Sequence, residues 1–160
     1  MEKRYYIAYG SNLHTEQMRT RCPDAVPMGT ALLTGWRLVF KGSKSGAYLT
    51  IEKAPGHKVP IAVWAVTPED ELRLDRYEGY PVFYQKLEMP ITYTGIESGK
   101  ERTRNCFVYV MRRDCQPGIP SRFYVNTCLQ GYLDFHFSPL YLSRALDYTK
   151  ALVREVKRNG

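Results

Sequence analysis

The chain has 160 residues, 44% of them hydrophobic, and a formal net charge of +7. These values are typical of a globular protein, and we expect a single domain over residues 1–160. The sequence has no apolar run of about 18 residues, and its first residues lack the apolar stretch of a secretory signal. We therefore expect no membrane span and a cytoplasmic location.

Strand patterns dominate the first part of the chain. Aromatic and β-branched residues predict strands at residues 4–9, 28–33, 36–40, 47–52, 59–66, 82–93 and 102–111. Glycine and proline predict turns at Thr34-Gly35, at Ala54-Pro55-Gly56 and at residues 95–100. The segment 41–46 has the composition of a flexible, charged loop tip.

Helical patterns are expected at residues 14–21, 67–78, 121–135 and 139–156. The second of these has the clearest boundaries, because Thr67 can cap its start, Pro68 suits its first turn and Gly79 can end it. Strands come early, helices come late, and few strand–helix–strand units occur. This order favours an α+β fold with a mostly antiparallel, curved or closed sheet.

Cysteine and histidine spacing is not that of a disulfide scaffold or a metal site. None of the four cysteines lies in a C-x-x-C pair, so we expect free thiols at Cys22, Cys106, Cys115 and Cys128. The three histidines are scattered and show no metal-binding spacing. We expect neither a metal ion nor a cofactor.

The first informative motif is Tyr9-Gly10-Ser11-Asn12, which follows the opening strand. A strand that ends in Gly-Ser-Asn turns sharply and leaves several backbone N–H groups pointing outward. Such donors can hold an anion, or an oxygen that becomes negative during a reaction. Taken alone, four letters are more often a simple tight turn.

The second informative feature is Glu78, in the last turn of the predicted helix 67–78. The helix dipole disfavours a negative charge there, and nearby aromatic residues such as Tyr77 and Phe83 could exclude water. Both effects raise a carboxyl pKa and would suit a general base. Taken alone, a glutamate at a helix end is more often exposed. Glu71 and Asp75 share this helix face, so a paired-carboxylate site is conceivable.

These segments together resemble the gamma-glutamylcyclotransferase-like family. The resemblance rests on three motifs in order: Tyr9-Gly10-Ser11-Asn12-Leu13, then Leu74-Asp75-x-Tyr77-Glu78-Gly79-x-Pro81-x-x-Tyr84, then Pro120-Ser121-x-x-Tyr124. It implies a small β-barrel flanked by helices, with a helical C-terminal part. It also implies a cavity at the barrel mouth, where a gamma-glutamyl group is cyclised to 5-oxoproline and an amine is released.

The resemblance also assigns residues to roles. Glu78 would be the acid/base residue. Tyr84 would line the pocket and Tyr124 would contact the substrate. The substrate-binding loop would consist of Tyr9, Gly10, Ser11, Asn12 and Leu13. The expected partner is a small gamma-glutamyl compound.

The form of the loop bears on the choice of substrate. The glutathione-specific branch carries G-Y-G-S-[LI], whereas this chain has Ala8 before Tyr9 and Asn12 after Ser11. The chain is therefore more similar to the branch that acts on gamma-glutamyl amino acids or gamma-glutamylamines. We expect loops 41–46 and 96–101 to determine which amine is released.

Other readings of the same residues remain open. Ser11 as a nucleophile would lack the G-x-S-x-G elbow and a placed histidine, and Cys106 and Cys128 fall in apolar segments. The main alternative is a non-catalytic module that binds a small molecule or single-stranded nucleic acid on a basic β-barrel. Nucleic acid is not the expected partner, because the nearest basic cluster, Arg37, Lys41 and Lys44, fits a loop tip.

Overall fold

A closed β-barrel forms the centre of the computed structural model, which describes residues 2–43 and 46–160. Its strands run in the order β3-β1-β5-β4-β2, and β2 pairs again with β3 to close the ring. Within the described residues, β1 and β5 pair in parallel and the other pairs are antiparallel. The strands are β1 (Arg4–Ala8), β2 (Val26–Ser43), β3 (Gly46–Val66), β4 (Tyr84–Gly95) and β5 (Glu101–Met111). The predicted α+β fold with a mostly antiparallel barrel is confirmed.

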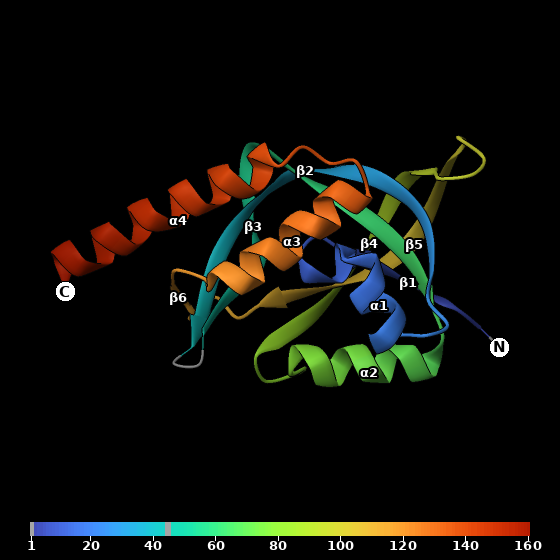
Figure 1. Cartoon of the computed structure of the whole chain (residues 1–160), viewed down its shortest axis with the longest axis horizontal. Helices are drawn as coiled ribbons and strands as arrows, with labels where there is room; N and C mark the ends of the chain where they lie inside the picture. The colour runs from blue at the N-terminus through green and yellow to red at the C-terminus, as the bar shows by residue number, and fades with distance from the viewer. Residues whose placement is uncertain (1, 44–45) are drawn as a thin grey trace.

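The helices cover the outside of the barrel (Figure 1). They are α1 (Thr15–Arg21), α2 (Pro68–Glu78), α3 (Arg122–Asp134) and α4 (Leu140–Asn159), each close to its predicted range. The beginning of α4 packs on β2, while its C-terminal half extends away from the barrel in Figure 1. No helix in the described ranges combines the length and the apolar character needed to cross a membrane.

The β2–β3 hairpin is longer and more continuous than the sequence pattern indicates. The expected turns at Thr34-Gly35 and Ala54-Pro55-Gly56 are wrong, because each lies within one unbroken strand. The register changes from Thr34–Lys58 to Trp36–Lys53 across this region, which makes it a bulge. Gly35 and Gly56 have positive φ angles of 83° and 85°, a conformation that glycine adopts easily. The glycines thus bend the hairpin around the barrel instead of ending its strands.

The expected loop tip at 41–46 is also largely strand. Lys41–Ser43 belong to β2 and Gly46 begins β3, while Lys44 and Ser45 lie outside the described residues. Lys41 is buried and forms an ion pair with Glu52, and its backbone pairs with the two-residue strand β6 (Gln116–Pro117). It is therefore not part of an exposed basic cluster.

Helix α2 begins and ends as its sequence predicts. The side chain of Thr67 accepts a hydrogen bond from the N–H of Asp70 at 3.1 Å, and Gly79 closes the helix at φ 67°. This left-handed cap reverses the chain directly after Glu78. The end of α2 is thereby fixed beside the start of β4.

Candidate active site

A cavity of about 300 Å³ opens where the ends of β1 and α2 meet the start of β4. The residues that line it are Tyr6, Tyr9, Gly10, Ser11, Asn12, Tyr48, Leu49, Tyr77, Glu78, Phe83, Tyr84, Tyr109 and Tyr124. Of the site residues expected from the sequence, all but Leu13 lie around this one cavity. Leu13 is the last residue of the turn after β1, and its side chain is fully buried in the hydrophobic core.

The turn after β1 presents backbone donors to the cavity. Ser11–Leu13 form a single 3₁₀ turn, in which the N–H of Leu13 donates to the carbonyl of Gly10 at 3.0 Å. The N–H groups of Ser11 and Asn12 precede this first bond and have no backbone partner in the described part of the chain. They can therefore donate to a negative oxygen of a bound molecule.

Glu78 is the last residue of α2, and its side chain is half-buried in the cavity wall. Its Oε1 atom accepts a hydrogen bond from Nδ2 of Asn12 at 3.3 Å. Burial raises the pKa of Glu78 to about 7, while the positive charge of Arg21 acts in the opposite direction. A carboxyl group with this pKa can accept and return a proton near neutral pH.

Asn12 is held at both ends of its amide group. Its Nδ2 donates to the hydroxyl of Tyr6 at 2.8 Å, and its Oδ1 accepts from the guanidinium of Arg21. The Arg21 guanidinium in turn lies over the ring of Tyr77, with Cζ 3.4 Å from the centroid. Arg21 thus fixes Asn12 and places a positive charge near Glu78. No sequence pattern had selected Arg21.

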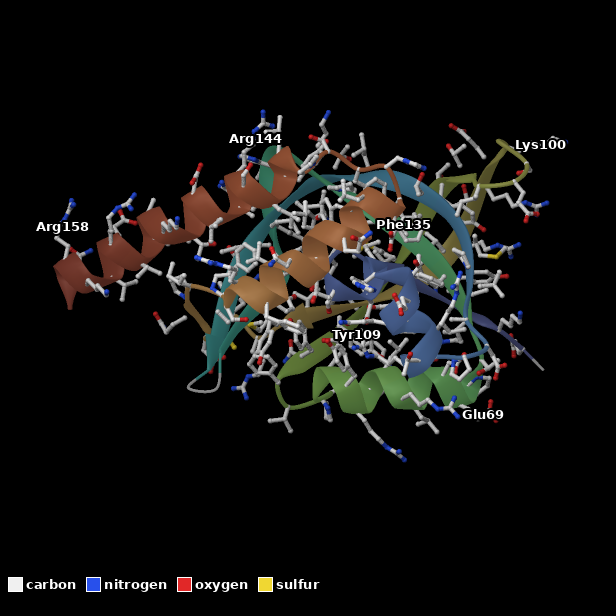
Figure 2. The ribbon with its side chains drawn as sticks, viewed as in Figure 1. Glu69, Lys100, Tyr109, Phe135, Arg144 and Arg158 are labelled. Atoms are coloured by element: carbon white, nitrogen blue, oxygen red, sulfur yellow. The ribbon has the colours of Figure 1, made fainter. Side chains whose placement is uncertain are left out.

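Three of the tyrosines have their hydroxyls engaged by backbone groups. Tyr84 donates to the carbonyl of Leu49 at 2.7 Å, and Tyr124 accepts from the N–H of Leu49 at 3.0 Å. Tyr9 donates to the carbonyl of Tyr109 at 2.7 Å, and Figure 2 shows Tyr109 above α2. These bonds fix the rings as rigid walls, so the cavity is preformed.

Six lining residues are not among those that the resemblance assigns to the site: Tyr6, Tyr48, Leu49, Tyr77, Phe83 and Tyr109. Tyr77 and Phe83 lie within five residues of Glu78, and their aromatic character indicates that they could exclude water from its carboxyl group. The others lie on β1, β3 and β5, and only the pairing of distant strands brings them together.

Two groups considered for the site lie elsewhere. Glu71 and Asp75 bind Nζ of Lys86, at 2.8 and 2.9 Å, and neither lines the cavity. The carboxylates therefore serve an ion-pair cluster and form no paired-carboxylate site with Glu78. The loop 96–101 also contributes no residue to the cavity wall, so its expected part in specificity is not supported.

The alternative nucleophiles are poorly placed. Cys106 and Cys128 are buried, and burial raises the pKa of their thiols to about 11 and about 12. The hydroxyl of Ser11 shares a hydrogen bond with that of Tyr77 at 3.2 Å, and no histidine is among the described lining residues. In residues 2–43 and 46–160, no group of three or more His, Cys, Asp and Glu side chains is arranged to hold a metal.

Gly131 of α3 lets this helix touch the turn that carries the backbone donors. A Cβ atom on Gly131 would lie 2.6 Å from the backbone N of His14 and from Cβ of Leu13. We expect Gly131→Ala to destabilise the protein by about 1–3 kcal/mol, because backbone must move. Urea unfolding would measure this loss. Asn126→Ala, on the exposed side of α3, should change stability by less than about 0.5 kcal/mol; equal losses would contradict the prediction.

Comparison with known proteins agrees with this fold. The model of the family described as "Gamma-glutamyl cyclotransferase, AIG2-like" matches residues 6–126. The chain belongs to this family. A solved structure named "Gamma-glutamyl cyclotransferase" superposes with a TM-score of 0.73 at 28% identity, covering 94% of this chain and 86% of that one.

Two curated mammalian proteins also match this chain. Gamma-glutamylcyclotransferase of Bos taurus is 35% identical over 114 residues, and that of Homo sapiens is 33% identical over the same length. Each alignment covers 66% of this chain and 58% of the relative. The part of this chain that the family model matches includes the residue 9–12 turn, Glu78, Tyr84 and Tyr124.

Proposed function

We propose that this protein is a cyclotransferase that converts a gamma-glutamyl amide to 5-oxoproline and a free amine. The observation that carries the proposal is the half-buried carboxyl group of Glu78, with a pKa near 7, beside the amide donors of the residue 9–12 turn. Family membership and the names of the bovine and human relatives support the same reaction.

The substrate of this reaction supplies its own nucleophile. Glu78 takes a proton from the α-ammonium group, and the freed nitrogen attacks the γ-carbonyl carbon to form the five-membered ring. The carbonyl oxygen becomes negative, and Glu78 then returns the proton to the amide nitrogen as the original C–N bond breaks. The ring nitrogen loses its second proton to the departing amine, which leaves as an ammonium ion. The protein therefore needs one acid/base group and rigid walls that hold the substrate bent, but no nucleophile of its own.

The turn and the tyrosines complete the proposed site. The N–H groups of Ser11 and Asn12 would donate to negative oxygens of the substrate, with Gly10 allowing the close approach. Tyr9, Tyr84 and Tyr124 would form the walls around the glutamyl chain. Leu13 would act indirectly, because its buried side chain anchors the turn in the core. A metal ion or cofactor has no step in this scheme.

The outer wall of the cavity should contact the leaving amine. Tyr48 and Phe83 are only partly buried, with ring centroids 6.2 Å apart, whereas Tyr6, Tyr9, Tyr84 and Tyr109 are buried. The described lining contains no lysine or arginine. The leaving group would thus meet aromatic rings and no cation, which suits gamma-glutamylamines and apolar gamma-glutamyl amino acids.

A panel of gamma-glutamyl compounds, assayed for 5-oxoproline and for released amine, tests the function. The panel should include gamma-glutamyl amides of amino acids and of amines, together with glutathione. Equal amounts of 5-oxoproline and amine from at least one compound are expected. If no member of the panel is turned over by folded protein, the proposed function is wrong.

The aromatic outer wall gives a prediction about specificity. We expect Phe83→Ala to raise KM for the gamma-glutamyl amide of phenylethylamine by about 3–10-fold, because an aromatic contact is lost. KM for the methylamine amide should change less than about twofold, since a methyl group does not extend to the outer wall. If KM changes equally for both substrates, the leaving amine does not contact Phe83.

A further inference from the structure

A second cavity lies between α4 and the β2–β3 hairpin, and the proposed reaction does not use it. Its volume is about 360 Å³, which is within the range of small-molecule sites. It shares no lining residue with the cavity of Glu78. Its walls are rigid where α4 meets β2, because the hydroxyl of Thr149 accepts a hydrogen bond from the N–H of Phe40 at 3.0 Å.

The charged side chains that line this cavity are all basic. Arg37 comes from β2, Lys58 from β3 and Arg144 from α4, with His57 beside Lys58. Figure 2 shows Arg144 on the early part of α4, away from the extended C-terminal half. Three separate elements therefore bring positive charge to one cavity. Like charges repel one another, so this arrangement costs energy unless a negative group balances it.

No carboxylate in the described residues balances these cations. Neither Arg37, Lys58 nor Arg144 takes part in an ion pair there. The residue opposite Arg37 in the hairpin is Glu52, but its carboxylate is paired with Lys41. The cavity thus has an excess of positive charge that a bound anion would neutralise.

Arg37 is held in a position to bind such an anion. Its guanidinium lies over the ring of Tyr148, with Cζ 3.4 Å from the centroid. Contact with an aromatic ring restricts the guanidinium without using its terminal N–H groups, which can still donate. The Nε atom is buried and has no hydrogen-bond partner in the described chain. A buried donor without an acceptor is costly, and because Nε is closed to solvent, an anion in the cavity would bind the terminal Nη groups of Arg37.

We propose that this cavity is a binding site for a small phosphate-bearing molecule, separate from the reaction at Glu78. A phosphate group offers several negative oxygens, which match the forked donors of Arg37 and Arg144 and the ammonium of Lys58. The rings of Tyr141 and Tyr148 provide the apolar part of the wall.

Isothermal titration calorimetry with pyrophosphate, at about 0.15 M salt to screen general charge effects, tests the site. We expect saturable binding by the wild type. The double variant Arg37→Gln/Arg144→Gln should bind at least about tenfold more weakly. A matched control, Arg154→Gln/Lys157→Gln, removes the same charge from the exposed end of α4 and should stay within about twofold of the wild type.

Further arms make the result decisive. Arg144→Gln alone, at an exposed position, covers the case in which the double variant fails to fold, and it should bind at least about threefold more weakly. Adenosine diphosphate as a second probe distinguishes a nucleotide from a bare phosphate, and either result supports the site. Absence of saturable binding, equal losses in both double variants, or equally tight binding of citrate would overturn the proposal.

The cavity can be tested independently of the proposed enzyme. Glu78→Gln should bind pyrophosphate as the wild type does, and Arg37→Gln/Arg144→Gln should release 5-oxoproline at the wild-type rate when no phosphate is present. Loss of pyrophosphate binding in Glu78→Gln would show that the anion occupies the other cavity, and would also overturn the proposal.

Discussion

Glu78→Gln is expected to keep the fold and the substrate affinity but to lose kcat by about 10²–10⁴-fold. Glutamine has nearly the same shape as glutamate and can still accept the hydrogen bond from Asn12. It cannot take a proton from the substrate ammonium, so the loss should fall on the chemical step. Steady-state release of 5-oxoproline, with substrate affinity measured separately, provides the test.

The same variant should be more stable than the wild type above neutral pH. The pKa of Glu78 is raised from 4.5 to about 7 in the folded protein. As pH rises between these values, the unfolded chain releases this proton while the folded chain retains it, so stability falls with rising pH. Above about pH 7 the ionised carboxyl costs about 1–3 kcal/mol, and glutamine removes this cost. Urea unfolding at about pH 8 measures the gain.

A matched control separates the chemistry of Glu78 from a general effect of lost charge. Glu69→Gln makes the same change in the first turn of α2, at the opposite end of the helix from Glu78, and Figure 2 shows Glu69 at that first turn. This variant should retain kcat, and its free energy of unfolding should fall by only a few tenths of a kcal/mol, because a negative charge in the first turn interacts favourably with the helix dipole. Near-normal turnover in Glu78→Gln would exclude Glu78 from the mechanism.

Local signals predicted the parts of the site that depend on neighbours in sequence. Helix α2 has a capping threonine at one end and a left-handed glycine at the other, and both act within one turn of the chain. The position of Glu78 at the helix end follows from them. The residue 9–12 turn is likewise a local event at the end of β1. These two elements account for the proposed acid/base group and the proposed backbone donors.

The remaining walls depend on contacts that no local pattern contains. Tyr6 reaches the cavity because β1 pairs in parallel with β5 at Phe107, about a hundred residues later. Tyr48 reaches it because the hairpin continues beyond Lys41, where the charged composition resembles a loop. Gly35 and Gly56 led to the wrong expectation of turns, because a glycine with positive φ can form a bulge within a strand as well as a turn. Register and barrel closure therefore had to come from the structure.

Arg21→Gln is expected to shift the acidic limb of the kcat/KM profile of 5-oxoproline release to higher pH. The positive charge of Arg21 lowers the pKa of Glu78, opposing the larger effect of burial. Without it the pKa of Glu78 should rise, so less of the carboxyl is ionised and able to act as a base. A shift of about one pH unit corresponds to an activity loss of about tenfold on the acidic limb. At high pH the loss should be smaller.

Arg21→Lys separates the charge of Arg21 from its hydrogen bond. Lysine keeps a positive charge but not the planar fork that donates to Asn12 and stacks on Tyr77. If the positive charge at residue 21 lowers the pKa of Glu78, the acidic limb of the Arg21→Lys profile should lie close to that of the wild type. Its kcat at high pH should fall by about 3–10-fold, because Asn12 would hold Glu78 less firmly. Arg19→Gln, at an exposed position of α1, provides the control for charge on the same helix. It should change neither the acidic limb of the profile nor kcat at high pH.

The two variants also distinguish a positioning residue from a purely structural one. A purely structural Arg21 would lower kcat/KM equally at every pH, in proportion to lost folded protein. A residue that sets the protonation of Glu78 must change the shape of the profile, because Asn12 and the charge act on the same carboxyl group. If the pH profiles of the wild type and Arg21→Gln are parallel, Arg21 does not influence the pKa of Glu78, and burial alone determines it.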